Sequence, residues 1–261
     1  MQEIVPVVYR NTCMLSKSQI SYIKSLHLKK FRKESGLFIT EGIKSITEFI
    51  NSSYQIHSIY YTASYLSFLP KNTTNIKLFE VNNAELQKIS TLQNPQGILA
   101  LIHIPSQQKI AAISLQQNFS LVLDNVQDPG NLGTIIRTAD WFGIKNIICS
   151  EDTVEAYNPK TVQSTMGSLA RTNIFYTNLE DFLSQTTLPI FGALLNGQNI
   201  YKTNWGNEGL ILLGNEGHGI SDELIKKITT PVTIPNFGNA ESLNVAVSAA
   251  IFCSELKRND K

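Results

Sequence analysis

Apolar positions along the first part of this chain repeat with two different periods. Residues 16–35 carry Ile20, Ile23 and Leu26 at helical spacing, which predicts a helix. Short apolar runs predict strands at 36–40, 56–61, 76–81 and 97–104. Helical spacing returns at 43–50 and 84–89. Strands that alternate with helices are typical of a layered α/β domain.

The same alternation continues in the second part of the chain. Apolar runs predict strands at 119–126, 146–149, 172–175, 189–194, 209–213 and 231–234. Four helices are expected. They begin near Leu132, at Pro159, at either Ser221 or Asp222, and at Ser242. Residues 106–118 are polar with a weak apolar stripe, which is typical of a linker. The pattern therefore predicts domains at 1–105 and 119–261 joined by this linker.

Composition narrows the class of protein. A length of 261 residues suits two domains, and no apolar run approaches the ~18 residues of a membrane span. The first residues, MQEIVPVVYRNTC, lack a basic stretch followed by an apolar one, so we expect no membrane partner and a cytoplasmic protein. The three cysteines are odd in number and far apart, which argues against a disulfide framework and a metal site.

Charge is distributed unevenly along the chain. Residues 1–115 carry 12 Lys and Arg against 6 Asp and Glu, whereas the remainder carries 10 against 15. The basic residues after the first predicted helix are Lys29, Lys30, Arg32 and Lys33. A solvated helix face is one interpretation of this cluster. The other is binding of nucleic-acid phosphates, from which clustered cations release counterions.

Three loops of the second domain share one design, because each follows an apolar strand and leads into a helix. The first offers Asn131 and Arg137, the second offers Glu216 among glycines, and the third offers Ser242 and Asn244. In open α/β sheets ligands bind at this edge. Turn formation for Asn131 and helix capping for Ser242 are the structural alternatives. Neither G-x-G-x-x-G nor G-x-x-x-x-G-K-[ST] spacing is present, which argues against dinucleotide and triphosphate sites.

The loop sequences NVQDPGNLGTIIRTADWFG, LLGNEGHGIS and IPNFGNAESLNVAVSAAIF closely resemble the three motifs of the SpoU (TrmH) branch of the SPOUT RNA methyltransferases. Upstream, KKFRKESGLFITEGIKSI and NPQGILALI resemble the ribosomal-L30e-like substrate-binding domain of that group. The resemblance implies an α/β SPOUT domain with a deep trefoil knot, preceded by a smaller α/β domain. It also implies bound S-adenosylmethionine and a homodimer whose interface includes the C-terminal helix.

The resemblance also assigns roles to residues. It implies that Arg137 is catalytic, either as the base or as a phosphate clamp, and that Asn131 orients Arg137 or the substrate. Glu216 would order the second loop, and Ser242 and Asn244 would place substrate and knot loop. The residues expected around the cofactor are Leu194, Leu213, Gly214, Gly217, Ile234 and Leu243.

The expected activity is methyl transfer to a ribose 2′-hydroxyl, which makes RNA the substrate because DNA lacks that group. The N-terminal domain favours ribosomal over transfer RNA. Two alternatives keep the fold, namely the same chemistry on transfer RNA and a non-catalytic RNA-binding protein. A third, an NAD-dependent oxidoreductase, requires binding of NAD in place of S-adenosylmethionine.

Overall fold

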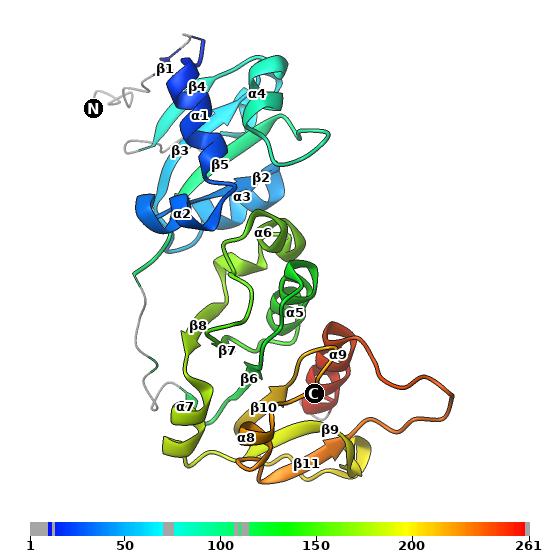
Figure 1. Cartoon of the computed structure of the whole chain (residues 1–261). Coiled ribbons are helices and arrows are strands. Elements are labelled where there is room, and N and C mark those ends of the chain that lie inside the picture. The colour runs from blue at the N-terminus through cyan, green and yellow to red at the C-terminus, as the bar shows by residue number, and fades with distance from the viewer. Residues whose placement is uncertain (1–9, 12–13, 70–75, 107–109, 111–114, 259–261) are drawn as a thin grey trace, which may run out of the picture. The chain divides into compact units, whose positions relative to one another are not determined.

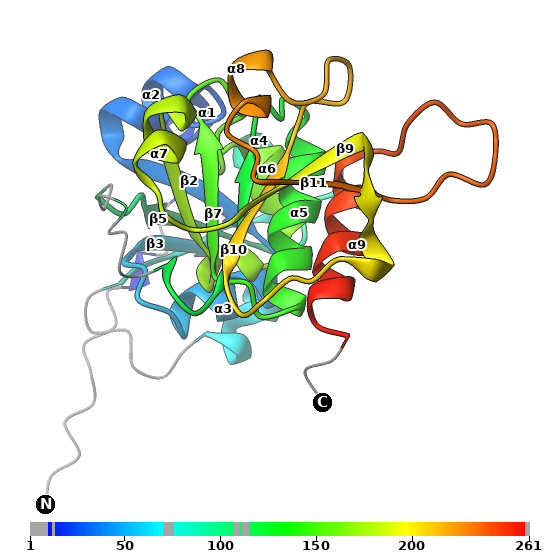
Figure 2. The same ribbon diagram turned by 90° about the horizontal axis from the view of Figure 1, so that it is seen from below.

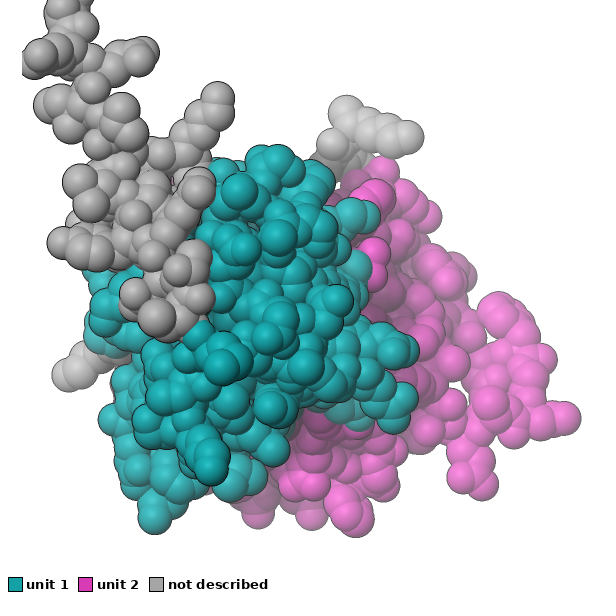
Figure 3. Space-filling model, turned by 90° about the horizontal axis from the view of Figure 1, so that it is seen from above, with its two compact units in different colours: residues 1–106, 157–170 teal, residues 107–156, 171–261 magenta. Residues whose placement is uncertain are grey.

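A computed structural model describes residues 10–11, 14–69, 76–106, 110 and 115–258. The chain divides into two compact units, which Figure 3 colours separately. Unit 1 contains residues 1–106 and 157–170, and unit 2 contains 107–156 and 171–261. Residues 157–170 therefore group with the first unit, although the sequence placed them in the second domain. The linker and domain boundaries otherwise stay predictions.

Unit 1 is built on a five-stranded mixed sheet. Its strands are β1 (Arg10–Asn11), β2 (Leu37–Glu41), β3 (Ile56–Tyr61), β4 (Lys77–Glu80) and β5 (Ile98–His103), in the spatial order β1-β4-β3-β5-β2. Its helices are α1 (Lys17–Ser25), α2 (Lys29–Ser35), α3 (Ile43–Ile50), α4 (Asn83–Ile89) and α6 (Pro159–Thr165), with 3-10 turns η1 (Ala63–Phe68) and η3 (Ser168–Ala170). The predicted helix 16–35 is thus two helices, broken at residues 26–28.

Both faces of this sheet are covered by other elements. The side chains of β2 alternate between the two faces and show what packs on each. Leu37 and Ile39 join a buried cluster with Ile23 and Leu86, from α1 and α4. Phe38 points the other way, where its ring centroid lies 5.5 Å from that of Phe49 on α3 and 4.9 Å from that of Tyr157. The contact with Tyr157, together with contacts between α6 and β2, shows why 157–170 belong to unit 1.

Unit 2 is built on a six-stranded sheet whose paired strands are all parallel. The strands are β6 (Phe119–Leu123), β7 (Asn146–Ser150), β8 (Asn173–Thr177), β9 (Ile190–Asn199), β10 (Gly209–Leu213) and β11 (Thr230–Thr233), in the order β11-β9-β10-β6-β7-β8. The helices are α5 (Pro129–Trp141), α7 (Leu179–Gln185), α8 (Asp222–Ile225) and α9 (Val245–Leu256), with the turn η4 (Ile200–Lys202). Figures 1 and 2 show α5 and α9 side by side, and they contact each other.

The order of these strands reverses between β6 and β10. From β6 the chain proceeds to β7 and β8 on one side, then returns to form β9, β10 and β11 on the other. Open α/β sheets bind ligands at such a switch point, outside the carboxyl ends of the strands. The predicted α/β class is confirmed for both units. The threading of the chain into a trefoil knot stays a prediction.

Some predicted boundaries in unit 2 are wrong for identifiable reasons. Helix α5 begins at Pro129 and not near Leu132, because Asp128 caps it by accepting from the Asn131 amide. Strand β9 continues to Asn199, five residues beyond its expected end, through a register shift opposite β11. Helix α7 was not predicted. In the described ranges no helix is long and apolar enough to cross a membrane.

Candidate functional site

The first and second loops are tied together where β6 and β10 end. Asp124 lies just after β6, and its backbone N–H donates to the Leu213 carbonyl at 2.9 Å. Its carboxylate accepts from the Ser221 amide at 2.8 Å, and Asn215 Nδ2 donates to the Asn125 carbonyl at 2.8 Å. Asp124 was not predicted as a site residue; its signal in the sequence is a lone carboxylate at the end of an apolar strand. These bonds fix the two loops as one surface.

Asn131 connects all three loops. Its Nδ2 donates to a carboxylate oxygen of Glu216 in the second loop. Its Oδ1 accepts from Nδ2 of Asn244 in the third loop, at 3.1 Å. The structure therefore brings together three of the five predicted catalytic residues. Because both ends of the Asn131 amide are engaged by neighbouring loops, this side chain positions the loops relative to one another.

The third loop leads into α9 through Asn244 and not through Ser242. Helix α9 begins at Val245, and Asn244 Oδ1 accepts from the amides of Ala246 and Val247 at 2.9 and 3.4 Å. The predicted cap at Ser242 is therefore wrong. Asn244 uses one side-chain atom to cap α9 and the other to reach Asn131, so it serves helix and site at once. Ser242 is exposed in the loop that precedes it.

Arg137 lies on α5, six residues after Asn131, and its side chain is exposed. Across the described ranges, no hydrogen bond or ion pair engages its guanidinium. Among the described residues Asn131 does not bond to Arg137, because both ends of its amide bond to the other two loops. The alternative, in which Asn131 orients the substrate, stays a prediction. An exposed guanidinium with five donors is available to a phosphate or to a developing oxyanion.

The residues predicted around the cofactor lie along the carboxyl edge of this sheet. Leu213 is buried at the end of β10, and Gly214 follows it. A Cβ at Gly214 would lie 2.1 Å from the Gly219 carbonyl carbon, so the turn closes only around a glycine. Gly217 is exposed within this turn, Leu194 and Ile234 are half-buried in β9 and after β11, and Leu243 is 47% exposed.

S-adenosylmethionine fits the chemistry of this edge. Thr233 Oγ1 donates to the Leu195 carbonyl at 3.0 Å, which holds the end of β11 against β9. Leu195 in β9 is 75% exposed and Leu243 before α9 is 47% exposed, so each presents an apolar side chain that a bound cofactor could cover. The loop after β11 extends away from the sheet in Figures 1 and 2, and Asn236 orders it through bonds to Gly238 and Ala240.

The predicted basic cluster in unit 1 divides into exposed and buried members. Lys29, Lys30 and Lys33 are exposed on α2. Arg32 is only 1% exposed, and its Nη1 donates to the Leu26 carbonyl at 2.8 Å. The assignment of Arg32 to an RNA-contacting surface is therefore corrected, because its guanidinium is used inside unit 1.

Comparison with known proteins agrees with this geometry. Residues 118–254 match the SpoU rRNA Methylase family, and residues 17–100 match the MRM3-like substrate binding domain. The chain belongs to the SpoU rRNA methylase family. The family predicted from the three loops is confirmed, and with it an RNA methyltransferase that uses S-adenosylmethionine.

Relatives cover nearly the whole chain. The 23S rRNA (guanosine(2553)-2′-O)-methyltransferase of Bacillus subtilis is 31% identical over 90% of this chain and 94% of its own. A solved structure from Porphyromonas gingivalis, assigned to the TrmH family, is 36% identical with a TM-score of 0.86, covering 94% of this chain and 99% of that one. The AdoMet-bound rRNA methyltransferase of Sinorhizobium meliloti is 29% identical with a TM-score of 0.84, covering 95% and 97%.

Proposed function

We propose that this protein transfers a methyl group from S-adenosylmethionine to a ribose 2′-hydroxyl of ribosomal RNA. The observation that carries the proposal is the junction of three loops at Asn131, on the helix that also carries the exposed Arg137, in a chain of the SpoU family. The relative from Bacillus subtilis acts on 23S rRNA, which favours ribosomal over transfer RNA. Such a protein works where ribosomes assemble, which supports the cytoplasmic location expected from sequence.

The chemistry needs orientation and charge stabilisation. S-adenosylmethionine supplies the activated methyl group. The chain must hold the ribose hydroxyl in line at roughly 3 Å and stabilise its oxygen as the proton leaves. Arg137 is suited to stabilising that oxygen and to holding the adjacent phosphate, since a guanidinium carries five N–H donors and no acceptor and is therefore a poor base. Asn131, Glu216 and Asn244 act as positioning residues because they hold the three loops in one arrangement.

Methyl transfer to ribose has a distinctive chemical consequence. Incubation with methyl-labelled S-adenosylmethionine and unmodified 23S rRNA, followed by alkali, is expected to leave the label in uncleaved dinucleotides, because alkaline cleavage needs a free 2′-hydroxyl. An unmodified transfer RNA transcript is the control substrate and is expected to accept little label. Label in mononucleotides would assign methylation to a base and overturn the ribose proposal.

We also propose that the protein is a homodimer through the groove between α5 and α9. The groove encloses about 560 Å³, and Thr134 and Thr138 of α5 line it with Val247 of α9 and Tyr201. Val247 and Tyr201 are 48% and 50% exposed. The small residues Ala246, Ala249 and Cys253 of α9 are buried within the chain, so they are not the part of α9 that a second copy would contact. A second copy would cover Val247 and Tyr201.

If the protein is a dimer through this groove, charged substitutions in the groove should lower the mass of the particle. Val247→Glu with Tyr201→Glu is expected to convert a particle of twice the 29.1 kDa chain mass into a monomer, because two buried carboxylates would lose hydration. Light scattering after gel filtration measures this mass. Ile225→Glu is the control. Ile225 is the last residue of α8 and its wild-type side chain is 38% exposed, so this variant should remain dimeric. A wild-type monomer at micromolar concentration would contradict the proposal.

A further inference from the structure

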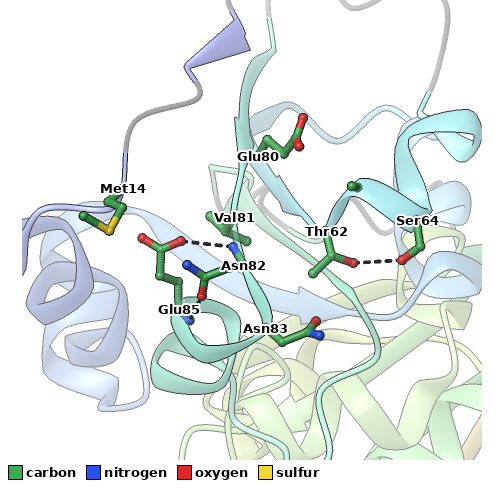
Figure 4. Close-up of a pocket in the computed structure, with 9 residues that line it drawn as sticks. Met14, Thr62, Ser64, Glu80, Val81, Asn82, Asn83 and Glu85 are labelled. Carbon is green, nitrogen blue, oxygen red and sulfur yellow. Dashed lines mark hydrogen bonds between the residues drawn. The ribbon is translucent and has the colours of Figure 1, made fainter.

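Two hollows on unit 1 differ in the charge of their lining. The first lies beyond the ends of β3 and β4, and Figure 4 shows the side chains that surround it. Glu80 and Glu85 contribute carboxylates to it, beside the hydroxyls of Thr62 and Ser64. Glu85 is held in place by accepting from the amides of Leu15 and Asn82, at 2.7 and 3.0 Å. Fixed carboxylates repel phosphate, so this hollow is unsuited to an RNA backbone.

The second hollow is basic. It is a groove of about 470 Å³ where α1 and α4 lie next to each other. Lys17 and Lys24 of α1 and Lys88 of α4 line it, with Ile20 and Ser21 between them. All three lysines are exposed, and the lining contains no carboxylate. The groove is therefore a concentration of positive charge with an apolar and hydroxyl floor.

The charge of this groove is not neutralised by neighbouring side chains. Within the described ranges, Lys17, Lys24 and Lys88 form no ion pair, whereas Lys30 on α2 lies 3.9 Å from the Glu34 carboxylate. Three ammonium groups sharing one groove repel each other, and that repulsion is relieved when an anion enters. A polyanion that spans the groove would neutralise all three ammonium groups at once.

We propose that the groove between α1 and α4 binds the sugar–phosphate backbone of the RNA substrate. Lys17 and Lys24 are seven residues apart, which separates them by about 10 Å along one face of α1. Lys88 faces them from α4, so the three amines contact phosphates on successive nucleotides of one strand. Such contacts fix the orientation of an RNA without reading its sequence. The inference rests on the proposed function and names the surface that holds its substrate.

The test compares two pairs of lysines in the full-length protein. Lys24→Gln with Lys88→Gln removes two charges from the groove, and Lys44→Gln with Lys77→Gln removes two exposed charges elsewhere on unit 1, on α3 and β4. The groove pair is expected to weaken binding of a 23S rRNA transcript about 10-fold at 0.1 M salt. It should also reduce the slope of log affinity against log salt by about 1 to 2. The control pair should change affinity less than about 2-fold, in line with ordinary surface substitutions.

Methyl transfer by the same proteins separates the two proposals. At saturating RNA the groove pair should retain the wild-type kcat while its KM for RNA rises, because the lysines bind RNA and take no part in the transfer. Equal affinities and salt slopes for the two pairs would overturn the groove, even if the wild type methylates 23S rRNA normally. Absence of ribose methylation by the wild type would instead overturn the proposed function.

Discussion

Replacing Arg137 by alanine is expected to slow methyl transfer roughly 10³-fold, the scale of losing a preorganised donor to a developing oxyanion. The side chain is exposed, and none of the described residues pairs with it, so its removal leaves no buried group without a partner. Binding of S-adenosylmethionine should change less than about 2-fold, because the expected cofactor residues lie in other loops. The defect should therefore lie in turnover and not in stability.

Single-turnover methylation of 23S rRNA and calorimetric titration with S-adenosylmethionine measure these two quantities separately. Arg137→Lys is the informative companion, because it retains the charge and loses the planar fork, and it should recover only part of the rate. Lys145→Ala is the matched control, since it removes one exposed charge just before β7, at the opposite edge of the sheet. Wild-type turnover by Arg137→Ala would remove this residue from the mechanism.

The sequence predicted best those strands whose side chains are mostly buried. The bounds of β3 and β10 match the predicted apolar runs, and β10 is buried at every position. Such a strand appears as one apolar run bounded by polar residues. Strand β9 was cut short because its last part, from Leu195 to Gln198, is exposed and carries polar residues. Its pairing there depends on β11, which a local pattern does not include.

The site was predictable in its loops and not in its contacts. The position of each loop after an apolar strand placed Asn131, Glu216 and Asn244 at one edge of the sheet. Which of Ser242 and Asn244 caps α9 could not be decided locally, because both types are good caps. The bond from Asn244 to Asn131 accompanies the cap at Asn244, and it joins residues 113 positions apart. Contacts of that range require the fold.

Arg32 is where the charge pattern and the structure diverge most, and the difference predicts a large effect on stability. Arg32→Ala is expected to lower the free energy of unfolding by roughly 3 kcal/mol, because it empties a buried site and leaves the Leu26 carbonyl without its charged donor. Lys33→Ala, one residue on and exposed, removes the same charge and should change stability by less than about 0.5 kcal/mol. Urea unfolding of the two variants measures both values.

The comparison also separates two reasons for weaker RNA binding. If Arg32 contacted RNA directly, Arg32→Ala would keep its stability and lose affinity together with a step in the salt slope. A buried Arg32 gives the opposite pattern, in which stability falls and the salt slope stays unchanged under conditions where the variant is folded. Arg32→Met retains much of the buried volume and lacks the donors, so it should recover only the packing part of the loss. A stable Arg32→Ala protein would show that the bond to Leu26 contributes little.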